Sequence, residues 1–477
     1  MSQCTDSGYQ QVSGGACSLT MYMEAAPGCV EPGEKGVRLA FMSESLSRGN
    51  SKKQRGVISG KRGPGKPYEG LPQMSGGLEA ASSSPQLGYL SRALCGAAAT
   101  VAEPPRELDA TAVVELDLGV VGLPCAGHGF VQDAVITVYG TQYYDGHYRV
   151  EKGVTADIIA IAAPYVAETL SSGCEVYRGR APVLEGAAID AGGGIVSLPV
   201  KGGVHDLNTG ERITITGSTS YDGTHTLADG SKNGILNITA TYTDETFDGT
   251  LVAVPQYFHH AFVLPKRQPT VTMEKYIDFE DSAATNKYQQ FGYCKINGFN
   301  FNFGGDEELR FSLDMAVGRQ TGSAAPLDVA PLVPPFIPLD NIEAAAWVAG
   351  KRRGDVESGT FTNTFGIEAK AAVGDLGQYS RMPEGDPECQ ATLTVFLEQD
   401  DYQELAKARS TVPFALSLCS ASGDEAWFHY PETELDVPDP TITGKEGIML
   451  EVTVMAFVDK GASVMSIDLI NRVPAYA

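Results

Sequence analysis

The sequence predicts a mainly β protein that has a β-sandwich or β-barrel core, one or two short helices, and two tandem small β-barrel or sandwich domains. Three observations support this fold class: 54 glycines among many Thr/Val/Ile alternations, a duplicated stretch of about 75 residues, and a long hairpin pattern after the duplication. Glycine favours tight turns, and β-branched residues fit a half-buried pleated surface. We therefore expect few helices.

The composition indicates a large globular protein with an acidic surface. The chain has 477 residues, 43% of them hydrophobic, and a formal net charge of −24. Its length allows about three domains at ~150 residues each. The negative charge disfavours non-specific binding to nucleic acid or anionic membranes. No window approaches the ~20 apolar residues of a membrane helix, and the N-terminus lacks a signal-peptide pattern, so we expect no membrane anchor.

The nine cysteines are scattered and never spaced as Cys-x-x-Cys. This distribution argues against a disulfide framework and against a zinc knuckle, so we interpret the cysteines as reduced thiols, most of them small core residues. No metal, cofactor or catalytic constellation is predicted.

A basic loop spans residues 47–66 and contains the spacing of a P-loop, with Gly60, four residues, and then Gly65 and Lys66. Pro67 stands where a P-loop needs Ser or Thr for magnesium, and no apolar strand leads into the loop. We therefore expect no nucleotide site, but a solvated loop that a partner orders. Its basic residues are Lys52, Lys53, Arg55, Lys61, Arg62 and Lys66.

Two helices are predicted. The first follows the basic loop, with Ser84 as N-cap, Pro85 at the first helical position and Gly96 at the C-terminal stop. Its apolar face would comprise Leu87, Leu90 and Leu94. The second spans about 400–409, with acidic residues in its first turn and basic residues in its last, as the helix dipole favours.

The duplication lies in the middle of the chain. The stretch "VITVYGTQYYDGHYRV" from Val135 aligns with "RITITGSTSYDGTHTL" from Arg212 without a gap, at an offset of 77 residues. Two copies indicate a tandem domain pair and not a solenoid, which would need three or more. We name the copies repeat 1 (107–180) and repeat 2 (184–257).

Both repeats contain a Tyr-Asp-Gly motif, Tyr144-Asp145-Gly146 in repeat 1 and Tyr221-Asp222-Gly223 in repeat 2. Asp-Gly commonly closes a β-hairpin, with the Tyr packing beside it, and we favour this interpretation over a ligand site. His128 and His205 occupy nearly equivalent positions, but a single His per repeat makes a poor metal site.

After the repeats a different β pattern begins at about residue 262. Cys294, Ile296, Phe299, Phe301 and Phe303 stand at largely alternating positions, and period-two apolar positions resume from Leu309 after a Gly-Gly-Asp turn. This pattern predicts a hairpin with one buried face. The end of the chain predicts a strand, a helix, two strands and a last long strand over 447–459.

The order of these elements resembles the major tail tube proteins of long-tailed, siphovirus-like bacteriophages. The resemblance rests on "MSESLSRGNSKKQRG" with the following strand and helix, on "GYCKINGFNFNFGGDEELRFSLDMAVG", and on the closing "GIMLEVTVMAFVD". It covers about 40–100 and 262–460. The repeats interrupt the family pattern, and residues 1–35 have no clear counterpart.

The resemblance implies a division into an unassigned N-terminal segment (1–35), a first part of the tube core (36–105), the two inserted repeats, and a second part of the core (262–477). It implies a non-enzymatic virion protein of the phage tail, assembled in the cytoplasm of the bacterial host. Its subunits would form stacked, hexameric rings. The implied partners are further copies of the chain, the tape measure protein, other tail proteins, and viral DNA that passes through the lumen without specific binding.

In such a tube the basic loop would dock on the neighbouring ring. The repeats would decorate the exterior of the tube, where they could bind host-surface glycans. Several alternatives remain at this stage. The chain could be a carbohydrate- or cell-surface-binding β protein, or a glycan hydrolase, although no nucleophile constellation supports an enzyme. A distal tail, tail terminator or secretion-system tube protein is also compatible with the pattern.

Overall fold

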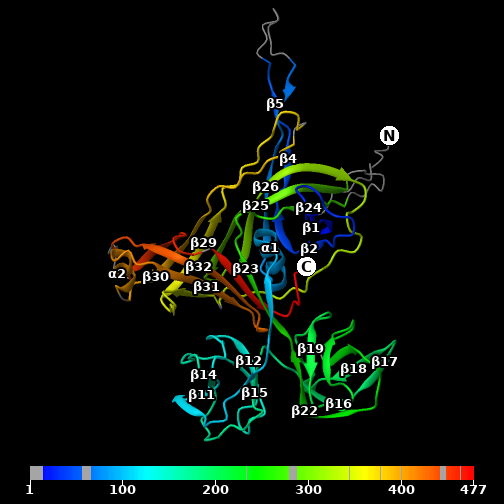
Figure 1. Cartoon of the computed structure of the whole chain (residues 1–477), viewed down its shortest axis with the longest axis vertical. Helices are drawn as coiled ribbons and strands as arrows, with labels where there is room; N and C mark the ends of the chain where they lie inside the picture. Colours follow the sequence, from blue (N-terminus) through cyan, green and yellow to red (C-terminus); the bar gives the residue numbers. More distant parts are fainter. Residues whose placement is uncertain are drawn as a thin grey trace, which may run out of the picture.

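The computed structural model describes residues 14–55, 66–232, 234–278, 287–342, 344–375, 378–398, 400–440, 447–461 and 463–476. It confirms the mainly β fold class. Figure 1 shows a core of packed β-sheets with a narrow arm at one end and two small β units at the other. In the described part of the chain, neither helix has the length and apolar character needed to cross a membrane.

Among the residues that the structure describes, the core contains 18 strands. They are β1 (Ser18–Met23), β2 (Val37–Leu39), β3 (Phe41–Glu44), β4 (Ser47–Gly49), β7 (Gln73–Ala81), β8 (Ala99–Glu103), β23 (Tyr257–Val263), β24 (Val271–Tyr276), β25 (Tyr288–Gly304), β26 (Arg310–Ser323), β27 (Ala345–Val348), β28 (Lys351–Arg352), β29 (Val356–Thr364), β30 (Glu388–Phe396), β31 (Val412–Cys419), β32 (Glu425–Asp436), β33 (Met449–Ala456) and β34 (Ser466–Asn471). β1 lies inside the N-terminal segment that the sequence left unassigned.

The core strands form one continuous sheet whose two halves are joined by the pairing of β32 with β33. The first half, which we call the first core sheet, has the order β7–β26–β25–β29–β30–β33. Its centre is the predicted hairpin of β25 and β26, which is confirmed. The buried apolar positions of β25 change from even numbers, Cys294 and Ile296, to odd numbers from Phe299 onward, because the register with β26 shifts between Ile296 and Gly298. This β-bulge explains why apolar and polar residues do not alternate strictly along the whole strand.

The second core sheet has the order β27–β31–β32–β34–β23–β8. It packs on the first sheet through aromatic side chains, with the Phe301 and Phe428 ring centroids 4.9 Å apart. The predicted last strand is too long, since β33 covers only Met449–Ala456. A further strand that the sequence did not predict, β34, lies between β32 and β23.

Both helices form close to the predicted positions. Helix α1 (Ser84–Cys95) lies between the sheets, and every residue except Arg92 is buried. Its N-cap is Ser83 and not Ser84, because Ser83 keeps the extended backbone that precedes a helix, so Pro85 is the second helical residue. Gly96 ends the helix with a φ of 87°, as predicted. Helix α2 (Asp401–Lys407) has Asp400 as its N-cap.

Each repeat forms two small sheets around its own apolar cluster. Repeat 1 contains β10 (Val114–Asp117), β11 (Val120–Pro124), β12 (Val135–Tyr139), β13 (Gly146–Arg149), β14 (Ile158–Ala162) and β15 (Glu175–Arg178), and β9 (Arg106–Glu107) leads into it. Repeat 2 contains β16 (Val183–Ala187), β17 (Ile189–Gly192), β18 (Ile195–Pro199), β19 (Arg212–Ile215), β20 (Gly223–Thr226), β21 (Ile235–Thr239) and β22 (Thr246–Pro255). The pairs Ile136–Arg178 and Ile213–Pro255 occupy the same place in the two ladders, at the offset of 77.

The two chain segments that lead to and from the repeats lie side by side. β8 and β23 pair antiparallel, from Ala99 opposite Ala261 to Glu103 opposite Tyr257. Core pairing therefore resumes at Tyr257, a few residues before the position at which the sequence pattern changes. The repeats leave the core through a closed two-strand junction.

Most described cysteines are core residues, in line with the sequence interpretation. Cys95, Cys125, Cys174, Cys294, Cys389 and Cys419 are buried. Burial alone raises the pKa of the Cys95 thiol to about 12, which disfavours the reactive thiolate.

Candidate assembly surfaces

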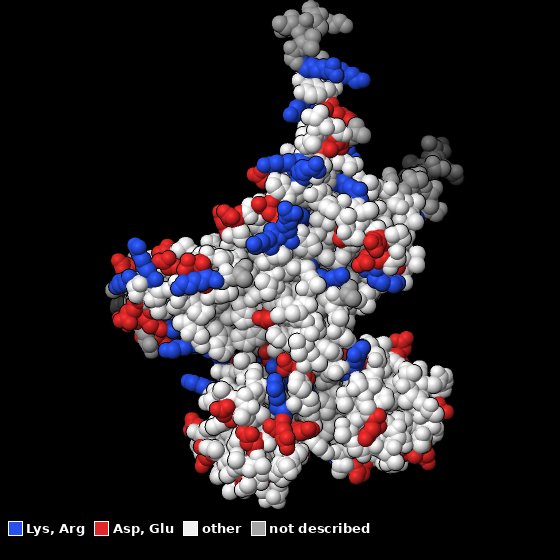
Figure 2. Space-filling model, in the orientation of Figure 1, with Lys and Arg blue, Asp and Glu red and all other residues white. Residues whose placement is uncertain are grey.

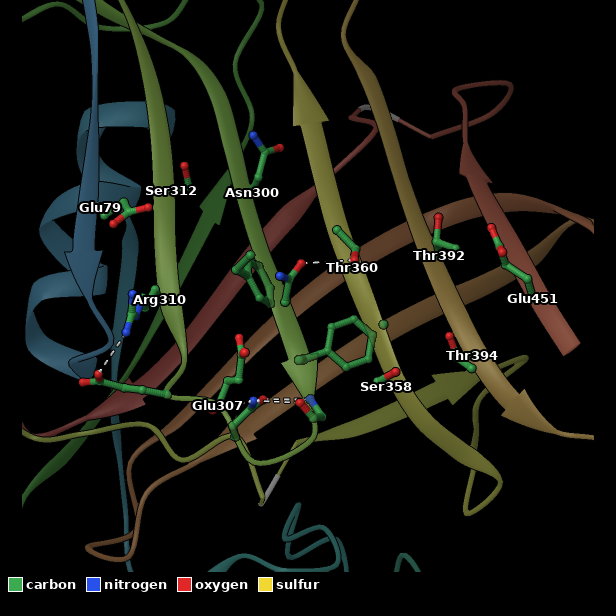
Figure 3. A pocket seen from close by; sticks show the side chains of 17 residues that line it. Glu79, Asn300, Glu307, Arg310, Ser312, Ser358, Thr360, Thr392, Thr394 and Glu451 are labelled. Carbon is green, nitrogen blue, oxygen red and sulfur yellow. Dashed lines mark hydrogen bonds and ion pairs between the residues drawn. The ribbon is translucent and has the colours of Figure 1, made fainter. Parts of the chain in front are cut away.

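The outward face of the first core sheet is lined by hydroxyl, amide and acidic side chains. In β25 the alternating residues Phe299, Phe301 and Phe303 are buried, so Asn300 and Asn302 lie on the opposite face. Figure 3 shows Asn300 with side chains of the neighbouring strands. The face also carries Glu79, Ser312, Ser358, Thr360, Thr392, Thr394 and Glu451. We call this surface the polar face.

The polar face is hollowed, and it is almost without positive charge. The hollow has a volume of about 890 Å³. Arg310 is the one basic side chain among the described residues that line it, and a carboxylate oxygen of Glu308 lies 3.8 Å from its guanidinium. Some of the remaining polar groups bond within the sheet: the Thr360 hydroxyl donates to Asn302 Oδ1 at 3.1 Å, and Asn300 Oδ1 accepts the backbone N–H of Asn363 at 2.9 Å. Such a surface offers no cluster of cations for phosphate.

The basic loop forms an arm that projects from the core. β5 (Lys52–Lys53) pairs with β6 (Tyr68–Glu69) in a two-stranded ribbon, and Figure 2 shows basic side chains along this arm, whereas acidic ones gather on the repeats. Lys52, Lys53, Arg55 and Lys66 are exposed. Lys61, Arg62 and most of the P-loop-like spacing lie outside the described residues. Two strands with so little burial depend on contacts from elsewhere for stability.

The Tyr-Asp-Gly motif organises one loop of each repeat. In repeat 1 the buried Tyr144 hydroxyl donates to the Val166 carbonyl at 2.7 Å and accepts the Val166 N–H at 2.8 Å. Asp145 accepts the backbone N–H of Thr141 at 2.7 Å. Gly146 begins β13, so the Asp-Gly pair is not a two-residue hairpin turn but the end of a longer loop between β12 and β13.

Repeat 2 repeats these contacts at the offset of 77. The Tyr221 hydroxyl bonds with the carbonyl and N–H of Thr243, at 2.6 and 2.9 Å, and Asp222 accepts the N–H of Ser218 at 2.6 Å. Gly223 begins β20. These bonds give the motif a role in holding its own loop.

The two equivalent histidines are also engaged inside their repeats. His128 Nε2 lies 2.7 Å from the Thr155 carbonyl, and His205 Nε2 lies 2.6 Å from the Lys232 carbonyl. No group of three or more metal-ligating side chains occurs in the part of the chain that the structure describes.

Buried ion pairs join the repeats to the core, and no local sequence pattern predicted them. Arg178 of repeat 1 pairs with the core residue Glu425, and both side chains are almost fully buried. The buried guanidinium of Arg472, directly after β34, lies 3.3 Å from Glu211 and 3.5 Å from Asp206 of repeat 2. It also lies 3.9 Å from the core residue Asp424. The repeat residues and their core partners, Arg178 with Glu425 and Arg472 with Glu211 and Asp206, are more than 200 positions apart, so only the tertiary structure brings them together.

Comparison with known proteins identifies the family. The sequence profile described as phage tail tube protein matches residues 14–456, which include the core up to β33 and both repeats. No curated protein is significantly similar to the chain. The match supports a structural role in the virion tail, and its extent covers the projecting arm, the polar face and the repeats alike. The chain therefore belongs to the phage tail tube protein family.

Proposed function

We propose that this chain is the major tube subunit of a long-tailed, siphovirus-like phage, and that its subunits close into hexameric rings that stack into the DNA-conducting tube. The polar face is the observation that carries the proposal, because it has the chemistry that a DNA channel needs. In the assembled tube this face lines the lumen.

The polar face suits rapid passage of DNA because it lacks the cations that would hold phosphate. Each lysine or arginine that neutralises a phosphate adds to the affinity through release of counterions. Here the wall consists mostly of short hydroxyl and amide groups, and Glu79 and Glu451 add negative charge. DNA, and before it the tape measure protein, would move along this wall without adhering.

The placement of the repeats supports an exterior position for them. Their junction strands, β8 and β23, belong to the second core sheet, whereas the polar face belongs to the first. A tube whose first sheet faces inward carries the repeats outward as a decoration. The basic arm then contacts acidic side chains of an adjacent ring. Assembly takes place in the host cytoplasm.

The test combines electron microscopy with a change of lumen charge. Purified protein should form tubes of stacked six-membered rings. In tubes built from the double variant Thr392→Lys and Thr394→Lys, DNA should be retained at low salt and released at high salt.

A matched control places the same two changes on repeat 2, as Thr224→Lys and Thr226→Lys, which are exposed. The lumen variant should slow the passage of DNA through the tube, while the control should only bind DNA on the outside. Equal passage through both kinds of tube would contradict the assignment of the polar face to the lumen.

A further inference from the structure

An aromatic groove lies on the flank of the core that β27, β31 and β32 form. Both tryptophans of the chain, Trp347 on β27 and Trp427 on β32, meet there with ring centroids 5.6 Å apart. The His429 ring stacks on Trp427 with an angle of 4° between the planes. Pro413 and Pro431 complete the walls of a groove of about 430 Å³. We call this site the aromatic groove.

The polar atoms of the aromatic groove already have partners inside the fold. The Trp347 indole N–H donates to Ser417 Oγ at 3.3 Å, and the Trp427 indole N–H donates to Glu425 Oε2 at 3.1 Å. Asp468 lies 3.1 Å from His429 Nε2. The groove therefore presents ring faces and proline rings, which suit an uncharged, apolar occupant better than an ion or a sugar.

A proline-rich segment on the core has the complementary character. Residues 330–338 read "APLVPPFIP" and contain no charged side chain. Val333 is 65% exposed and Phe336 is 56% exposed. Pro fixes its own φ and pushes the preceding residue to an extended conformation, so the four prolines favour the polyproline II form that aromatic-lined grooves bind. We call it the proline strap.

Backbone hydrogen bonds hold the proline strap in place at both ends. Leu332 N–H donates to the Gly36 carbonyl at 2.7 Å, and its carbonyl accepts the N–H of Arg38 at 2.8 Å. Near the other end, Ser84 N–H donates to the Ile337 carbonyl at 2.9 Å. Little conformational entropy remains to be lost on binding, because the strap is ordered before a partner arrives.

The strap and the groove lie on different flanks of the core. The strap begins beside β2, whereas the groove is built from β27, β31 and β32, and Figure 1 places β2 on one side of α1 and β31 and β32 on the other. Two complementary patches on different flanks of one subunit produce a head-to-tail contact, which closes into a ring when the rotation permits. The strap carries no charge, and the Asp468 carboxylate that lines the groove already lies 3.1 Å from both His429 Nε2 and His259 Nε2, so the contact would leave no carboxylate without a partner.

We propose that the proline strap of one copy docks into the aromatic groove of the next copy, and that this contact joins neighbouring subunits within a ring. The inference rests on the proposed function, since it specifies the partner surface for ring formation. Val333 and Phe336 supply the apolar side chains, and Trp347 and Trp427 supply the receiving rings.

The first experiment replaces the exposed side chains of the strap. The double variant Val333→Ser and Phe336→Ser should remain folded, with an unchanged urea unfolding midpoint, but should need at least about tenfold more protein to form rings and tubes, the factor that corresponds to ~1.4 kcal/mol. The matched control is Leu118→Ser with Val204→Ser, which removes two exposed apolar side chains from the repeats. The control should assemble like the unmodified protein.

The second experiment tests the contact directly and does not depend on a loss of assembly. A variant with Val333→Cys and Pro413→Cys, both at exposed positions, is assembled and treated with a short bis-maleimide. Cross-linked oligomers should form only when both new cysteines are present, above the background of the natural cysteines. Neither single variant should form them.

The outcomes separate this inference from the proposed function. If the strap variant assembles at the concentration of the unmodified protein, or if tubes form without cross-linking between positions 333 and 413, the strap-to-groove contact is wrong while the tube assignment stands. If the unmodified protein forms neither rings nor tubes, the proposed function itself fails.

Discussion

Replacing Arg472 by Met would remove the one cation from a buried acidic site between repeat 2 and the core. The guanidinium lies within 4 Å of three carboxylates, those of Asp206, Glu211 and Asp424, and only 2% of the Arg472 side chain is exposed. Met fills most of the same volume but leaves the carboxylates without a counter-charge. Breaking a buried ion pair in this way costs about 3–5 kcal/mol of unfolding free energy.

The loss should depend strongly on pH, and its direction follows from the buried acids. Burial raises the pKa of Asp424 to about 6, from an ordinary value of 3.8, and burial also raises the pKa of Glu211. An acid whose pKa is higher in the folded state destabilises the fold as the pH rises through that pKa. Arg472 lowers both pKa values, so its removal raises them further. The variant should therefore regain stability between pH 7 and pH 5.

The assay is urea unfolding at pH 7 and at pH 5, monitored through the fluorescence of the two core tryptophans. The control is Arg352→Met, because the Arg352 side chain is 33% exposed and has one carboxylate partner, Asp133, at 2.5 Å. A partly exposed pair of this kind contributes at most about 1 kcal/mol. Equal losses in the two variants at pH 7, or a loss in Arg472→Met that is the same at both pH values, would refute the reasoning.

Three further predictions concern assembly and the repeats. Changing the four described basic residues of the arm to Glu should raise the protein concentration needed for ring stacking. Raised salt should have the same effect, because exposed charge pairs are screened over ~8–10 Å. The control variant Lys152→Glu on repeat 1 should stack normally, and stacking that does not depend on salt would point to apolar contacts. A protein in which a short Gly-Ser turn replaces residues 104–256 should still assemble, because β8 and β23 are already paired at Glu103 and Tyr257. Its tubes should have a smaller outer diameter in electron micrographs. A folded deletion protein that cannot assemble would show that the repeats make contacts between subunits. Tyr144→Phe should destabilise repeat 1 by about 1–3 kcal/mol, since Val166 loses both bonds to the hydroxyl, whereas the exposed Tyr143→Phe should have no effect in the same thermal unfolding assay.

Local patterns were enough to predict much of the architecture. The alternation around Phe299 and the Gly-Gly turn predicted the β25–β26 hairpin, because a strand with one buried face must alternate whatever it pairs with. The proline and glycine at the two ends of α1 fixed the helix to within one residue. The duplication predicted two copies of one fold, since equal patterns at an offset of 77 form equal ladders.

Only the tertiary structure decided the surfaces on which assembly depends. The polar face combines strands from residues 73–81, 288–323, 356–396 and 449–456, and its composition follows from their pairing and register, which no local pattern determines. The same holds for β34, whose place between β32 and β23 depends on partners more than 30 and more than 200 residues away. Arg472 and the two tryptophans acquire their neighbours in the same way. The sequence by itself determined which segments form strands, because that preference is local, whereas the pairing of distant strands determined which of their outward side chains share a surface.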